Sequence, residues 1–184
     1  REITEGSPVL VSVTAFDGTS GRMLSESGRP QMSLGIVGSD QISSDLAMLV
    51  TGKHEGSRIL AFRTVAMGDG SPNTREIDVV DILPSIATGT SVDATVGPMS
   101  VEMSPEGPLI SHIATLPGGV TTQALIKGDG VQVHEGDRVV AQFTVLGWTD
   151  GVVRVNTWET GVPAVVNLNT AMKGLANALV DQKV

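Results

Sequence analysis

The stretch EGSPVLVSVT at residues 5–14 returns as EGDRVVAQFT at residues 135–144. The two stretches lie 130 positions apart, and each joins a glycine turn to a run rich in β-branched residues. The repeat continues at almost the same distance as far as the Leu-Val pair at residues 49–50, which returns at 179–180. Because internal repetition reveals architecture more directly than residue propensities do, the sequence predicts two related domains.

The predicted boundary between these domains lies in residues 85–107, which are rich in proline, glycine, serine and threonine. We therefore expect one domain at residues 1–84, a linker at 85–107 with one strand at 99–103, and a second domain at 108–184. In the first copy Lys53 leads into a strand-like run, whereas the second copy stops where that run would begin. The second domain is expected to lack its closing strand, so that either the natural chain continues further or this domain is loosely folded.

Runs of β-branched residues bounded by turn-forming residues are typical of strands. Such runs are at residues 9–16, 58–66 and 77–83 in the first copy and at 139–146, 151–155 and 164–168 in the second. Each copy also has one helical pattern. The first pattern covers residues 43–53, where Ser43 or Ser44 is placed to cap the helix. The second covers residues 170–179, where Thr170 is placed to do so. Several strands with one short helix in each copy predict an α+β fold.

Composition excludes several classes of function. The chain has no cysteine and three histidines, which rules out disulfides, thiolate chemistry and a Cys/His metal site. A net charge of −8 argues against nucleic acid as a partner, because binding phosphates requires a basic surface. No apolar run approaches the roughly 20 residues of a transmembrane helix. Asp129 and Asp137 lie in glycine-rich turns and are interpreted as turn residues, so neither a metal nor a cofactor is expected.

Three motifs of the second copy resemble, in order and spacing, the opening of an FKBP-type peptidyl-prolyl cis-trans isomerase domain. They are ALIKGDG at residues 124–130, VHEGDRV at 133–139 and GWTDG at 147–151. In the first copy GSRIL at 56–60 and VVDIL at 79–83 are also similar to the family, so the resemblance covers most of the chain. Its form is that of the tandem FKBP-like exported proteins and lipoproteins of actinobacteria.

This resemblance implies two FKBP-like domains, each an antiparallel sheet half-wrapped round a short helix. It also implies export to the cell envelope or the extracellular space, with any lipid anchor in a segment not included here. In the second copy it places a substrate pocket at eight residues. These are Phe143, Arg154, Val155, Trp158, Ala164, Ala171, Met172 and Leu175. No catalytic residue is assigned, because twisting a prolyl amide in an apolar pocket needs neither a nucleophile nor a metal.

Several pocket positions differ from the family's residues. Arg154 and Val155 stand where the family has phenylalanine and aspartate, and Leu175 stands where it has tryptophan. The chain has no tyrosine, three phenylalanines and two tryptophans, which is few aromatic residues for two pockets. The resemblance therefore implies an isomerase (rotamase) of exported polypeptides whose activity is weak or lost.

Three functions remain open from the sequence. The first is prolyl isomerisation at Xaa-Pro bonds, the second is a non-enzymatic FKBP-like polypeptide-binding or chaperone module of the cell envelope, and the third is a β-rich spacer. The partner in the first two is a proline-containing polypeptide segment. Plainer interpretations compete at single residues, with Phe143 as ordinary core, Trp158 as a packing residue and Arg154 as a solvated strand residue. We interpret four methionines as core filler: Met23, Met32, Met48 and Met172.

Overall fold

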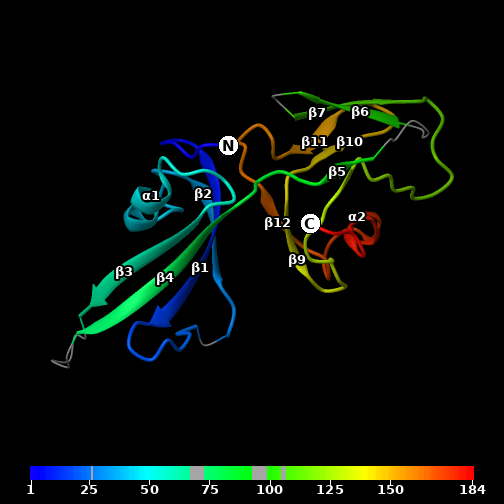
Figure 1. Cartoon of the computed structure of the whole chain (residues 1–184). Coiled ribbons are helices and arrows are strands. Elements are labelled where there is room, and N and C mark those ends of the chain that lie inside the picture. Colours follow the sequence, from blue (N-terminus) through cyan, green and yellow to red (C-terminus); the bar gives the residue numbers. More distant parts are fainter. Residues whose placement is uncertain (26, 67–72, 93–98, 105–106) are drawn as a thin grey trace. The chain divides into compact units, whose positions relative to one another are not determined.

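The computed structural model describes residues 1–25, 27–66, 73–92, 99–104 and 107–184. It divides into two compact units, unit 1 at Arg1–Ser85 and unit 2 at Ile86–Val184 (Figure 1). The described elements are mostly strands, with one short helix in each unit, so the fold is of the α+β class.

Unit 1 is a four-stranded antiparallel sheet with one helix. Its elements are β1 (Pro8–Asp17), β2 (Gln31–Ile36), α1 (Ser44–Val50), β3 (Arg58–Val65) and β4 (Thr74–Leu83). The strand order is β2-β1-β4-β3, and Figure 1 shows β1, β4 and β3 running side by side. β1 is therefore an inner strand, with β2 on one edge and β4 on the other.

The core of unit 1 lies between this sheet and α1. Alternate residues of a strand share one face of the sheet, and those of β1 and β4 supply much of the buried cluster. Its members are Ile3, Val9, Val11, Val37, Ile42, Leu46, Val50, Val80 and Ile82. Leu46 and Val50 come from α1, which begins where the Ser43 side chain accepts a hydrogen bond from the Leu46 N–H. The helix is held mainly by burying this face, since seven residues form only a marginal helix alone.

Unit 2 consists of short strand pairs and one helix. Its elements are β5 (Thr90–Ser91), β6 (Met99–Ser104), β7 (Gly107–His112), β8 (Ile126–Lys127), β9 (Arg138–Ala141), β10 (Thr144–Leu146), β11 (Val153–Asn156), β12 (Ala164–Asn167) and α2 (Lys173–Leu179). The pairs are β5 with β8, β6 with β7, β9 with β12 and β10 with β11, all antiparallel. β5 and β6, in the segment predicted as a linker, belong to unit 2. Its buried cluster is smaller and comprises Val133, Val166 and Leu168.

The repeat in the sequence is a repeat in strand register. Val9 of β1 lies opposite Gly35 of β2. Val139 of β9 is 130 positions after Val9, and it lies opposite Val166 of β12, which is 131 positions after Gly35. The strands β9 and β12 therefore correspond to β1 and β2. The two units are built on the same antiparallel pairing.

The segments on either side of this pairing are also equivalent. The Ile3 N–H donates to the Lys53 carbonyl at 2.7 Å, and the Val133 N–H donates to the Gln182 carbonyl at 2.8 Å. Both helices are followed by a residue with positive φ, glycine in the first unit and Asp181 in the second. A residue five positions before each repeated strand is thus tied to the chain beyond the helix.

The single strand predicted at residues 139–146 is divided into β9 and β10 by Gln142 and Phe143. At this point the chain exchanges one partner strand for another. The Thr157 N–H donates to the Phe143 carbonyl, while the side-chain amide of Gln142 donates to the Gly161 carbonyl. β1 has no such break, because β4 pairs with it from Leu10 to its end.

Two predictions from the sequence are wrong. Thr170 does not cap α2, because it lies in a turn in which its N–H and hydroxyl both donate to the Asn167 carbonyl. The N-cap residue is Met172, which makes no side-chain hydrogen bond. Met32, Met48 and Met172 are not core filler either, because their side chains are exposed, whereas Met23 is half-buried.

Replacing Met172 by serine is expected to stabilise unit 2. The Met172→Ser hydroxyl would accept a hydrogen bond from the first turn of α2, as Ser43 does in unit 1. Little burial is lost because Met172 is 65% exposed. We expect the free energy of unfolding of unit 2 to rise by about 1 kcal/mol. Urea titration followed by tryptophan fluorescence measures this directly, because both tryptophans are in unit 2.

Ser43→Ala is the matched change in unit 1. It should lower the stability of that unit by about 1 kcal/mol and leave the tryptophan signal at its original midpoint. An unchanged or lower midpoint for Met172→Ser would contradict the assignment of the cap.

Candidate functional site

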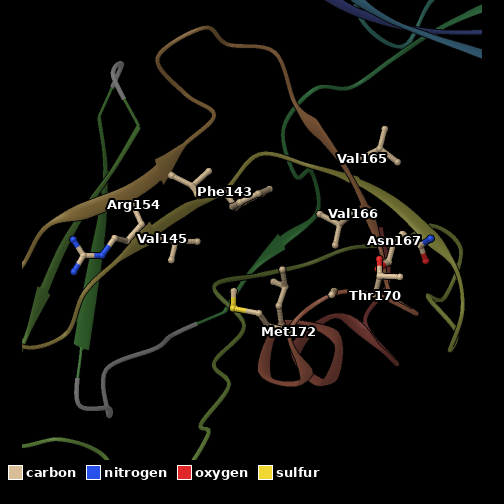
Figure 2. Close-up of a pocket in the computed structure, with 11 residues that line it drawn as sticks. Phe143, Val145, Arg154, Val165, Val166, Asn167, Thr170 and Met172 are labelled. Carbon is tan, nitrogen blue, oxygen red and sulfur yellow. The ribbon is translucent and has the colours of Figure 1, made fainter.

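Unit 2 contains an open pocket of about 550 Å³ between the beginning of α2 and the strands β10, β11 and β12 (Figure 2). Its lining residues are Phe143, Val145, Arg154, Val155, Val165, Val166, Asn167, Thr170, Ala171, Met172 and Leu175. Most of these side chains are apolar. Six of the eight residues predicted for the pocket are among them, and Trp158 and Ala164 are not.

Strand alternation and the turn before α2 position these side chains. Phe143 and Val145 are two residues apart and project to the same side. In Figure 2, Val166 points towards α2 and Val165 points away from it, which agrees with burial of the former and exposure of the latter. Met172 faces the space from the start of the helix. The walls therefore come from three strands and one helix end that lie far apart in the sequence.

Phe143, Ala171 and Leu175 also pack against the small core of unit 2. They therefore contribute to the core and to the pocket wall. Phe143 fits both interpretations made from the sequence, because the same side chain packs against the core and lines the pocket. Val155, Val165 and Met172 are exposed and line the pocket without belonging to the core. These three positions can be changed with the least effect on folding.

Arg154 is the charged residue at the pocket, and it is engaged by Asp150. Its guanidinium lies 2.5 Å from the Asp150 carboxylate and points away from the pocket centre in Figure 2. The same carboxylate accepts a hydrogen bond from the Val152 N–H at 3.0 Å. The Val152 N–H and then Arg154 lower the pKa of Asp150 below its ordinary value. The cation is thus partly neutralised, and the pocket keeps an apolar character.

The tryptophans pack elsewhere in unit 2. Trp158 lies against Gly107 of β7 so closely that a Cβ atom added at Gly107 would come within 2.9 Å of the Trp158 Cβ. The Trp148 ring contacts the ring of His112, also on β7, with centroids 4.4 Å apart and the ring planes tilted by 35°. Ala164 lies at the start of β12, opposite Ala141. In this structure neither Trp158 nor Ala164 forms part of the pocket wall.

Sequence reasoning missed five lining residues: Val145, Val165, Val166, Asn167 and Thr170. Val145 could have been predicted, because it follows Phe143 by two positions in a predicted strand and so lies on the same face. Asn167 and Thr170 carried none, since they line the pocket through the turn in which the Asn167 carbonyl accepts from Thr170.

Within the described residues, no cluster of three or more histidine, aspartate or glutamate side chains could hold a metal ion. Asp137, interpreted as a turn residue, accepts a hydrogen bond from the His134 N–H at 2.8 Å. Neither described helix is long and apolar enough to cross a membrane.

No family model, curated protein or solved structure matches this chain. The resemblance to the FKBP family therefore stays a prediction based on the quoted motifs, and any activity that it implies belongs to the proposals below.

The Asp150 carboxyl should titrate below the ordinary aspartate pKa of 3.8. Because its folded-state pKa is lowered, the charged group stabilises unit 2 above pH 3.8, and this contribution disappears as the pH falls through the lower folded-state value. Arg154→Ala should raise the pKa only part of the way, since the Val152 N–H remains. Carboxyl ¹³C NMR titration of both proteins measures the shift. A pKa of Asp150 at its ordinary value in the unmodified chain would contradict this geometry.

Proposed function

We propose that the chain is an FKBP-like protein that binds an apolar, proline-containing segment of an exported polypeptide in the pocket of unit 2. The observation that carries the proposal is the pocket itself, with walls from β10–β12 and α2 that are mainly apolar. The motif resemblance supports the same family and the same kind of partner. This is the binding or chaperone function, in which isomerisation is weak or lost.

The size and chemistry of the pocket suit a short peptide segment. A volume of about 550 Å³ lies within the range of roughly 300–1,000 Å³ typical of small-ligand sites. Phe143 offers one aromatic ring, and Val145 and Leu175 add aliphatic surface, against which an apolar proline ring can pack. A strongly charged segment is disfavoured, because the walls offer little to compensate for the lost hydration.

Acceleration of prolyl isomerisation requires more than binding. The protein must hold the twisted amide more tightly than either planar isomer. The lining contains one aromatic ring and no carboxylate, and the Thr170 hydroxyl already donates to the Asn167 carbonyl. Such a pocket holds the ground state and the twisted state about equally. Binding with little acceleration is the expected result.

NMR exchange spectroscopy with the peptide Ala-Leu-Pro-Phe and the full chain tests the proposal. Methyl signals of Ala171, Met172 and Leu175 should shift on titration, while the cis/trans exchange rate of the peptide stays close to its uncatalysed value. Strong acceleration would establish the isomerase function instead. Absence of any methyl shift would contradict polypeptide binding in this pocket and leave the spacer function.

Two exposed methionines provide a matched pair of variants. Met172→Glu places a carboxylate at the pocket and should weaken peptide binding about fivefold, or roughly 1 kcal/mol. Met48→Glu changes an exposed methionine of α1, outside the pocket, and should leave the affinity unchanged. Equal effects of the two variants would show that the peptide does not contact Met172.

A further inference from the structure

A segment without regular structure links β7 to β8 in unit 2, at residues 113–125. Residues 114–124, all of which the structure describes, form no backbone hydrogen bond. A segment with few backbone hydrogen bonds and few buried contacts is displaced at a small cost in free energy. Residues 114–124 can therefore change position while the strands and α2 stay in place.

This segment contacts two different walls of the pocket. At its start, the ring of His112 contacts the ring of Trp148, which follows β10 by two residues. Further along, Val120 lies against Gly174 in the first turn of α2, where a Cβ atom added to the glycine would come within 3.6 Å of the Val120 Cγ2. Since β10 and the start of α2 both line the pocket, the chain between His112 and Val120 runs from one wall to another.

The middle of this stretch carries a Leu-Pro pair, which is the kind of segment that the pocket is proposed to bind. Leu116 is 64% exposed, Pro117 is half-buried, and neither is among the residues that line the pocket. Gly118 and Gly119 follow, and glycine leaves the backbone free to turn. Because Leu116 is exposed in this structure, its transfer into an apolar pocket would remove apolar area from water and is favourable.

The Leu-Pro pair is close enough to reach the pocket. Pro117 precedes Val120 by three residues, and three extended residues span about 10 Å. Val120 lies against Gly174, which is two residues from the pocket residue Met172. Met172 faces the pocket from the start of α2 (Figure 2). A short tether of this kind gives the internal segment a roughly millimolar effective concentration, so even a weak affinity of the pocket for Leu-Pro populates a closed state.

We propose that residues 114–119 form a strap that closes over the pocket of unit 2, with Leu116-Pro117 as an internal ligand that competes with an external polypeptide. This inference rests on the proposed function and adds a regulation of the same site. The arrangement described above is the open state, in which the pocket is accessible. In the closed state the Leu116 side chain and the proline ring pack against Phe143 and Met172. An external segment binds only the open state, so its apparent affinity falls in proportion to the open fraction.

A variant without the internal ligand tests the strap. The double variant Leu116→Ser/Pro117→Ser removes both apolar side chains at positions outside the core of unit 2. The peptide Ala-Leu-Pro-Phe is titrated against the full chain, and binding is followed by the methyl signals of Ala171 and Leu175. We expect the double variant to bind the peptide about threefold more tightly than the unmodified chain, which corresponds to a strap that is closed about two thirds of the time.

Leu109→Ser is the matched control, because Leu109 is 58% exposed on β7 and is not among the residues that line the pocket. Its affinity for the peptide should equal that of the unmodified chain. The closed state is also observed directly in the free chain, where the Leu116 methyl groups should show nuclear Overhauser effects to the Phe143 ring. A synthetic peptide of residues 113–119, added to the double variant, should shift the same two methyl signals of the pocket as Ala-Leu-Pro-Phe does.

Other outcomes overturn the inference. Equal affinities of the unmodified chain and the double variant would leave peptide binding in the pocket intact and exclude competition by the strap. Weaker binding by the double variant would show that residues 116–117 help to hold the external peptide. An equal gain from Leu109→Ser would assign the effect to the loss of any exposed leucine. No methyl shift in the double variant with either peptide would contradict this inference and the proposed function together.

Discussion

Both units depend on one antiparallel pairing, between the strand after the glutamate-glycine turn and the strand that leads to the helix. It fixes β1 on β2 and β9 on β12 in equivalent register. Since side chains alternate along a strand, this register decides which of them face the helix. The hydrogen bonds of Ile3 and Val133 then join the segment before each repeated strand to the chain beyond the helix of the same unit. This strand pairing therefore determines the core, the position of the helix and the position of the pocket.

The units differ in what covers the other edge of the repeated strand. In unit 1, β4 supplies Val80 and Ile82 to a cluster of nine buried residues, whereas the corresponding cluster in unit 2 has three. Burial of apolar area is the main favourable contribution to folding, so we expect unit 1 to be the more stable unit. The same difference leaves unit 2 with an open pocket.

The sequence predicted β1, β3, β4 and one helix in each unit, because the repeat and the β-branched runs are local signals, but it did not predict β2 or β7. It did not predict the break at Gln142 and Phe143, which arises when the chain changes its pairing from β12 to β11. It also misplaced the cap of α2, because the turn at Asn167 brings Met172 to that position. Six of the residues that the resemblance implied line the pocket, whereas Trp158 packs against Gly107, far away in the sequence. Long-range contacts decided the parts that the sequence could not predict.

Native-state hydrogen exchange of the free chain tests the central claim, that the repeated strand is covered on two edges in unit 1 and, within the described part of the chain, on one edge in unit 2. Ser12 and Thr14 lie on the edge paired with β4, and their counterparts 130 positions later are Gln142 and Thr144. The account predicts slow exchange at Ser12 and Thr14 and fast exchange at Gln142 and Thr144, with Val139 and Ala141 protected by β12. Equal protection of Thr14 and Thr144 at all concentrations of the chain would contradict it.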